Sequence, residues 1–183
     1  MRLLIIIGML FLSSCDIDTS YSYYSDPKSH YANEITNRFA VQLRDEMQLY
    51  PIGTGGGCMD NIRMLALSCL YEKEIDIEEA RKLLMEAGIL FLKTANEHEK
   101  ARPYLANYPF GLKNIELRFF IQKKPGQERS REKLSIFSLI DGILRYKASP
   151  PLPERLITLY EETFAEAAAK LNIQLTPETG LEL

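Results

Sequence analysis

The sequence contains few of the residues from which most catalytic centres are built. It has only two histidines, His30 and His98, and neither belongs to an H-E-x-x-H motif. It also lacks a C-x-x-C pair and a G-x-S-x-G nucleophile motif. We therefore predict no metal site and no cofactor, and we do not expect an enzyme. Carboxylate chemistry stays open, because the chain holds 25 acidic residues and their spacing selects no catalytic pair.

Excess basic charge and a membrane-spanning apolar run are also missing. The 183-residue chain has a formal net charge of −3, which argues against a nucleic-acid binder that depends on phosphate contacts. The apolar run from Leu3 to Leu12 has about ten residues, whereas a helix needs roughly twenty to span a bilayer. A run of this length is typical of the core of a signal peptide.

The chain has three cysteines, and the spacing of two of them argues against a disulfide. Cys58, Ile62, Leu65 and Cys69 recur at the spacing of one helix face. On one helix the two thiols would lie about 16 Å apart, well beyond the ~7 Å over which Cα atoms can be bridged. We predict buried, free thiols, and the alternatives are a bridge to another chain or reactive thiols.

The first fifteen residues carry an ordered set of signals: Arg2, the apolar run, and then Leu12-Ser13-Ser14-Cys15. This order resembles the lipobox of bacterial lipoproteins. The resemblance implies that residues 1–14 are a cleaved signal peptide and that Cys15 is lipidated with diacylglycerol and an acyl chain such as palmitate. Two or three acyl chains hold a protein on a membrane, whereas one is marginal. An ordinary secretory signal or a buried N-terminal helix is the alternative.

The same resemblance implies a location in the bacterial cell envelope, on a membrane that faces the periplasm or the exterior. Asp16 follows the cysteine, and an acidic residue there resembles a signal for retention in the inner membrane. Residues 15–30 then form the lipidated cysteine and a tether, residues 31–174 a single α+β domain, and residues 175–183 a short tail. One domain is the ordinary expectation for this length.

Helical periodicity predicts three helices in the first half of the chain. The first covers residues 31–50 and ends at Pro51, and a glycine-rich loop at 51–57 leads into a second helix over 58–71. The third covers residues 77–97 and is apolar on nearly all sides, with Asp76 and Glu79 as a capping box. Its surplus apolar surface is either core or a contact with a partner protein.

The period then changes to two, which predicts strands over residues 115–122, 134–140 and 143–148. Asp141-Gly142 predicts a hairpin between the last two, with a single strand bulged at Gly142 as the alternative. A final helix is predicted over 153–171. The expected fold is α+β, with three N-terminal helices, a small three-strand antiparallel meander and a C-terminal helix that packs back on it.

A candidate ligand site combines the glycine loop with an aromatic connection. Backbone N–H groups of Gly55, Gly56 and Gly57, at the start of the predicted second helix, could hold an anion, with Tyr104 and Tyr108 beside it. The spacing fits neither a P-loop nor a dinucleotide motif. A simple connector between helices is the alternative.

The stretches RPYLANYPF and LIDGILRY make the body of the chain resemble small bacterial lipoproteins of unknown activity. We therefore expect a membrane-anchored envelope lipoprotein that acts as a non-catalytic binding or structural module. Its partners would be the membrane, through the lipid anchor, and an envelope protein. The alternatives are a tethered small-ligand or anion binder that uses the glycine loop, and an envelope hydrolase.

Overall fold

The computed structural model describes residues 26–122, 130–152 and 154–175. The predicted signal peptide, the lipidation of Cys15 and most of the tail lie outside the described residues. The elements are α1 (Pro27–Met47), β1 (Leu49–Gly57), β2 (Met64–Tyr71), α2 (Ile77–Asn96), η1 (Glu99–Tyr104), η2 (Leu112–Asn114), β3 (Ile115–Ile121), β4 (Leu134–Ile140), β5 (Ile143–Ala148), β6 (Ile157–Thr163) and α3 (Phe164–Lys170).

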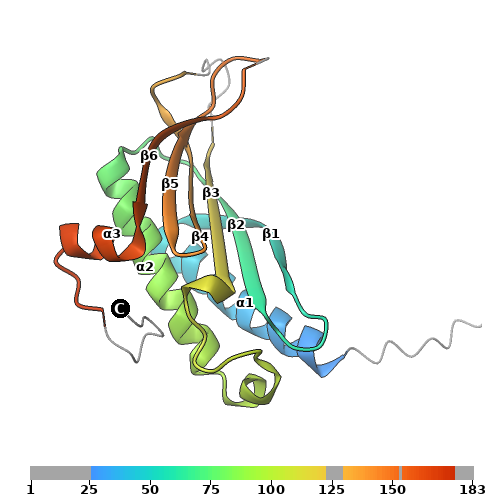
Figure 1. Cartoon of the computed structure of the whole chain (residues 1–183). Helices are drawn as coiled ribbons and strands as arrows, with labels where there is room; N and C mark the ends of the chain where they lie inside the picture. The colour runs from blue at the N-terminus through green and yellow to red at the C-terminus, as the bar shows by residue number, and fades with distance from the viewer. Residues whose placement is uncertain (1–25, 123–129, 153, 176–183) are drawn as a thin grey trace, which may run out of the picture.

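The strands form one six-stranded sheet whose spatial order is the chain order, β1 to β6 (Figure 1). All neighbouring strands are antiparallel except β2 and β3, which are parallel. A parallel pair cannot be joined by a tight turn and needs a crossover connection. Helix α2 belongs to that connection, so the long apolar helix is held against the middle of the sheet.

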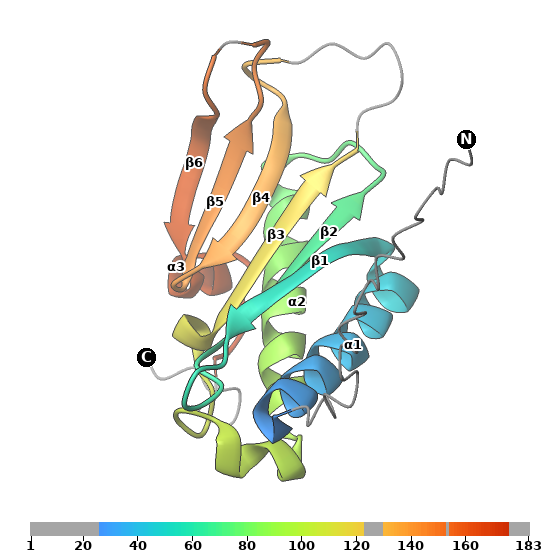
Figure 2. The ribbon, with the colours of Figure 1, turned by 90° about the vertical axis from the view of Figure 1, so that its right-hand side faces the viewer.

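The helices pack on one face of the sheet, and the main core lies between the two layers (Figure 2). Phe39 of α1 stacks on Phe91 of α2 with ring centroids 4.1 Å apart. On the sheet side, Phe119 and Phe137 are fully buried and meet edge to face. This accounts for the apolar breadth of α2, which contacts α1, the sheet and α3.

Two predicted helices are confirmed, with shifted ends. Helix α1 begins at Pro27, where the side chain of Asp26 accepts a hydrogen bond from the backbone N–H of Lys28. It ends before Gln48, whose positive φ of 57° breaks the helix, so Pro51 is not its terminator. Helix α2 begins with the predicted capping box of Asp76 and Glu79.

The predicted glycine loop and the helix over residues 58–71 are wrong. The glycines belong to edge strand β1, and the segment after them forms β2, next to β3 near the centre of the sheet. The misassignment arose because the run Met64–Tyr71 is nearly continuous in apolar residues, as buried strands are. In such a run, positions at helical spacing are apolar by default, and Leu65 and Cys69 of the predicted cysteine stripe are two such positions.

The predicted three-strand meander is also wrong as a description of the fold. Strands β3, β4 and β5 are present, and the hairpin is confirmed by positive φ angles of 53° at Asp141 and 74° at Gly142. However, β2 adds to one side of them and β6 to the other, which gives a mixed six-stranded sheet. The predicted C-terminal helix is strand β6 followed by the short helix α3.

The two long helices begin at opposite ends of the sheet. The start of α1, dark blue in Figure 2, lies at the lower end, and the start of α2 lies at the upper end. Asp26, the first described residue, is therefore far from the beginning of α2. This arrangement separates the point where the N-terminal segment joins the domain from the groove described next.

Candidate functional site

A groove of about 500 Å³ lies beside the start of α2, where the segment leading into the helix meets one end of the sheet. Its volume falls within the range of roughly 300–1,000 Å³ that is common for small-ligand sites. The residues that line it are Glu74, Ile75, Asp76, Ile77, Glu78, Ile121, Glu132, Lys133, Leu134, Ser135 and Leu159.

The apolar part of the groove comes from both layers of the fold. Ile75 and Ile77 are supplied by the entry to α2, and Ile121 and Leu134 by the neighbouring ends of β3 and β4. Leu159 comes from β6, at a point where the pairing with β5 shifts by one residue. Such a bulge leaves an extra residue and redirects its side chain. All five side chains are partly exposed, so the groove keeps apolar surface in contact with water.

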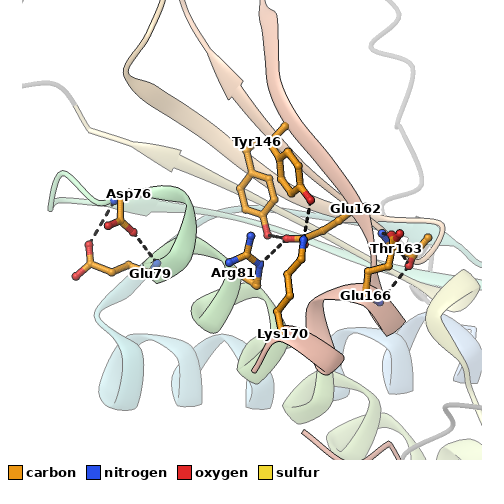
Figure 3. A network of polar contacts seen from close by, with 9 residues as sticks. Asp76, Glu79, Arg81, Tyr146, Glu162, Thr163, Glu166 and Lys170 are labelled. Atoms are coloured by element: carbon orange, nitrogen blue, oxygen red, sulfur yellow. Dashed lines mark hydrogen bonds and ion pairs between the residues drawn. The ribbon is translucent and has the colours of Figure 1, made fainter. Parts of the chain in front are cut away.

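The rim of the groove is predominantly acidic. Four carboxylates line it, those of Glu74, Asp76, Glu78 and Glu132, against the single ammonium group of Lys133. The Lys133 Nζ atom lies 3.4 Å from an oxygen of Glu74, so this ion pair links the two segments that form the rim. Asp76 accepts the backbone N–H of Glu79 at 2.8 Å and so caps α2 (Figure 3).

A buried carboxylate network joins β6 to α2 and α3 on the helix side of the sheet (Figure 3). Glu162 on β6 is 3% exposed. Its Oε1 atom accepts from Arg81 Nε at 2.7 Å and from the Tyr146 hydroxyl at 2.8 Å. Its Oε2 atom accepts from Lys170 Nζ at 2.6 Å, and this amine also donates to the Tyr160 hydroxyl at 2.6 Å.

The network lowers the pKa of Glu162 and raises the pKa of Tyr146 and of Lys170, which keeps the carboxylate and the amine charged and the hydroxyl neutral. Burial raises the pKa of Glu162, but the hydrogen bonds from Lys170, Arg81 and Tyr146 outweigh burial and hold it below the ordinary value. Burial, followed by the hydrogen bond to Glu162, raises the pKa of Tyr146. The hydrogen bond to Glu162 also raises the pKa of Lys170.

The network joins four elements rather than exposing a reactive group. Arg81 comes from α2, Tyr146 from β5, Glu162 from β6 and Lys170 from α3. Both oxygens of Glu162 are engaged, and in the described part of the chain every buried side-chain nitrogen and oxygen has a hydrogen-bond partner. Arg81 lies one turn after Glu78, so the network fixes the part of α2 that borders the groove.

The residues of the predicted glycine site are not brought together. Gly55 and Gly56 line a smaller cleft of about 240 Å³ beside α1, but Gly57, Tyr104 and Tyr108 do not line it. Tyr104 instead packs on the Tyr31 ring, with centroids 5.4 Å apart. Tyr108 is exposed under the guanidinium of Arg102. Because strand β2 follows the glycines, the helix start on which the anion site was based does not exist.

The described cysteines are free thiols. Cys69 is buried in β2, and burial raises its pKa to about 12, so this thiol stays protonated and inert at neutral pH. Cys58 is half-buried, and burial raises its pKa as well. The prediction of buried, free thiols is confirmed for Cys69, whereas Cys58 is free but only half-buried. The common helix face from which both were argued is wrong.

His98 has a structural role. It is 9% exposed, its Nδ1 atom accepts the backbone N–H of Ala101 at 3.2 Å, and its Nε2 atom lies 3.4 Å from a carboxylate oxygen of Glu34. Within residues 26–122, 130–152 and 154–175, no group of three potential metal ligands comes together. In the same residues, no helix has both the length and the apolar character needed to cross a membrane.

Sequence reasoning missed the groove because its walls come from segments far apart in the chain. One signal pointed to it: in residues 74–78 acidic and apolar residues alternate at the entry to a helix whose cap was recognised. Comparison of the chain with protein-family models, with curated proteins and with solved structures found no match. The function is therefore argued from the groove and the N-terminal sequence.

Proposed function

We propose that this protein is a lipid-anchored module of the bacterial cell envelope that binds a partner or ligand without transforming it. The anchor is the lipidated Cys15, and the binding site is the groove at the start of α2. A tethered binding module needs a site that stays accessible while the chain is held at the membrane. The position of the groove relative to the start of α1 is the observation that carries the proposal.

The described chain begins at Asp26, immediately before α1, and the start of α1 lies at the end of the sheet opposite to the start of α2, which borders the groove (Figure 2). A domain held from that end can keep its groove turned away from the lipid headgroups. The sequence order of Arg2, apolar run and Leu12-Ser13-Ser14-Cys15 supports the lipid attachment. Two or three acyl chains suffice for a stable anchor, so the domain itself needs no membrane-seeking surface.

A binding role is favoured over catalysis by what the polar groups of the groove already do. Asp76 caps α2, and Glu74 is ion-paired with Lys133. One observation favours an envelope hydrolase as a second candidate: Glu78 and Glu132 bring carboxylates from two segments to the same groove, as acid–base chemistry requires. Release of soluble fragments from cell-wall material by the wild type, but not by Glu132→Gln, would favour the hydrolase.

Metabolic labelling with an azide-bearing palmitate analogue tests the anchor. Bacteria that express the full chain should give a labelled, membrane-associated protein, and Cys15→Ala should lose both the label and the membrane association. Cys58→Ala is the matched control, because it removes a thiol of the folded domain and should retain the label. If Cys15→Ala kept its label and its membrane fractionation, the proposal would be wrong.

A further inference from the structure

We propose that the groove at the start of α2 takes an apolar side chain flanked by basic residues, presented by an extended segment of a partner protein. This inference rests on the proposed binding function and names the chemistry of the partner. It is argued from the apolar lining, from the charge of the rim and from the capping of α2.

The apolar lining of the groove favours an apolar side chain at the centre of the partner segment. The five aliphatic side chains of the groove come from the α2 entry and from three strands, so they surround a bound group on more than one side. Burial of apolar surface contributes about 25 cal/mol per Å². An aliphatic or aromatic side chain is therefore the natural occupant, and a purely polar ligand would leave this surface unmatched.

The acidic rim of the groove favours basic residues on both sides of the apolar residue of the partner segment. Asp76 and Glu78 stand on the α2 side, Glu132 stands on the β4 side, and the only amine among the lining residues is already paired with Glu74. A partner with one basic residue on each side of its apolar residue would match both rims. A free amphiphile with a single charged end would match one, which is why we infer a peptide segment.

The capping of α2 argues against an acidic partner segment. A helix start attracts anions through its exposed N–H groups, but here Asp76 Oδ1 accepts from the Glu79 N–H at 2.8 Å and Glu79 Oε2 accepts from the Asp76 N–H at 3.3 Å. The chain's own carboxylates thus occupy the position that an anionic ligand would need. An acidic partner would meet unfavourable charge at both rims.

The walls of the groove are held in place before binding. Arg81, on the second turn of α2, is bound to Glu162 of β6, the strand that also supplies Leu159 to the groove. A site fixed in this way needs little reordering when it binds. The partner segment, by contrast, must become ordered, which predicts moderate affinity.

Fluorescence polarisation tests the inference with the full-length Cys15→Ala chain, which needs no lipid. The probe is a fluorescein-labelled peptide, Gly-Lys-Leu-Leu-Arg-Gly, and the comparison peptide carries Glu in place of Lys and Arg. The basic peptide should bind at least about tenfold more tightly than the acidic peptide, and added salt should weaken it. Equal binding of the two peptides, or no saturable binding of the basic one, would overturn the inference.

Variants locate the binding on the protein. The double variant Glu78→Gln with Glu132→Gln should weaken the basic peptide about fivefold, and Leu159→Ser should weaken both peptides. Glu99→Gln, an exposed acid of η1, which follows the end of α2 opposite to the groove, is the matched control and should leave affinity unchanged. A loss of affinity in Glu99→Gln equal to that of the double variant would show non-specific attraction and overturn the site. Far-UV circular dichroism confirms that each variant is folded.

A competition experiment distinguishes a peptide ligand from a simpler ligand that is also positively charged. Unlabelled peptide should displace the probe at far lower concentration than octylamine, which has one charge and an apolar chain. Displacement by both at equal concentration would overturn the assignment to a peptide. These outcomes do not depend on lipidation, so an intact label at Cys15 with no peptide binding would refute this inference and leave the anchor standing.

Discussion

At the scale of single residues, Glu162 is held in place from three sides. A carboxylate that is 3% exposed is costly to bury, and it is tolerated here because an arginine, a tyrosine hydroxyl and a lysine all donate to it. No sequence pattern singled it out. In the sequence, Glu161 and Glu162 cannot be told apart from acidic residues that are exposed to solvent. Only the alternation of side chains along β6 turns Glu162 inward and Glu161 outward.

We predict that Glu162→Gln lowers the free energy of unfolding by about 3 kcal/mol at pH 7, because it leaves the buried guanidinium of Arg81 without its counter-charge. The matched control is Glu161→Gln on the same strand. Glu161 is exposed and pairs with Arg145 at 2.6 Å, so its loss should cost at most about 1 kcal/mol. Urea titration at constant temperature measures both. Equal costs for the two variants would contradict the assignment of Glu162 as the constrained member.

The same variant should change how stability depends on acid. The folded state lowers the pKa of Glu162 below its ordinary value of 4.5, so the unfolded state binds the proton first as the pH falls. The stabilisation is complete above about pH 4.5 and is lost as the pH falls through the lower, folded pKa. Below about pH 4.5 the wild type should lose stability more steeply than Glu162→Gln, by at most about 1.4 kcal/mol per pH unit. Parallel curves would show that Glu162 is not the titrating group.

At the scale of elements, a helix or strand could be predicted from the sequence where its segment carried a clear local signal. The segment of α1 has a 3.6-residue apolar period with charge between, and α2 is marked by its capping box. Strands β3 and β5 alternate, and β4 meets β5 at the Asp141-Gly142 turn, so the type of these elements was predictable. Strand β1 was missed because glycine is a poor strand former, and its pairing with β2 overrides that preference. Strand β6 was missed because Leu156, Tyr160, Phe164 and Ala167 happen to match a helix face.

The glycines of β1 give a prediction at this scale, because they are not equivalent. A Cβ atom on Gly56 would lie 2.6 Å from the carbonyl oxygen of Met64 in β2, whereas one on Gly53 would meet nothing within 4 Å. Gly56→Ala should therefore destabilise the fold by about 1–3 kcal/mol. Gly53→Ala should be neutral or raise stability by up to about 1 kcal/mol, because alanine reduces the freedom of the unfolded chain.

Thermal unfolding of the two glycine variants measures this difference. The close approach of β1 and β2 at Gly56 predicts a clearly lower midpoint for Gly56→Ala than for Gly53→Ala. If both variants unfolded at the temperature of the wild type, the tight contact at Gly56 would not be a requirement of the fold.

At the scale of the whole molecule, the α+β class could be predicted but the architecture could not. Composition and local period indicate which elements exist, whereas the order of strands depends on contacts between distant segments. The parallel pairing of β2 with β3 joins residues such as Leu67 and Leu117, and nothing local to either strand specifies it. The groove depends on that same assembly, which is why it could not be predicted as a site.

The continuous core predicts cooperative unfolding. Buried residues from Ala32 to Ala168 form one cluster, with no division between the first strands and the last. We expect a single transition in urea, with the loss of secondary structure in far-UV circular dichroism coinciding with the loss of tyrosine packing in near-UV circular dichroism. Two separated transitions would show that the halves of the sheet unfold independently.

The parallel contact between β2 and β3 also has a consequence for how the chain comes off the ribosome. The first hairpin can form as soon as β2 has been synthesised, but its inner edge has no partner until α2 and the following turns have been made. During that interval an apolar strand with unpaired backbone groups is exposed, which is the condition under which strands aggregate. Strand β2, which lies between β1 and β3 in the finished sheet, is therefore the segment that must be protected from aggregation until β3 has been made.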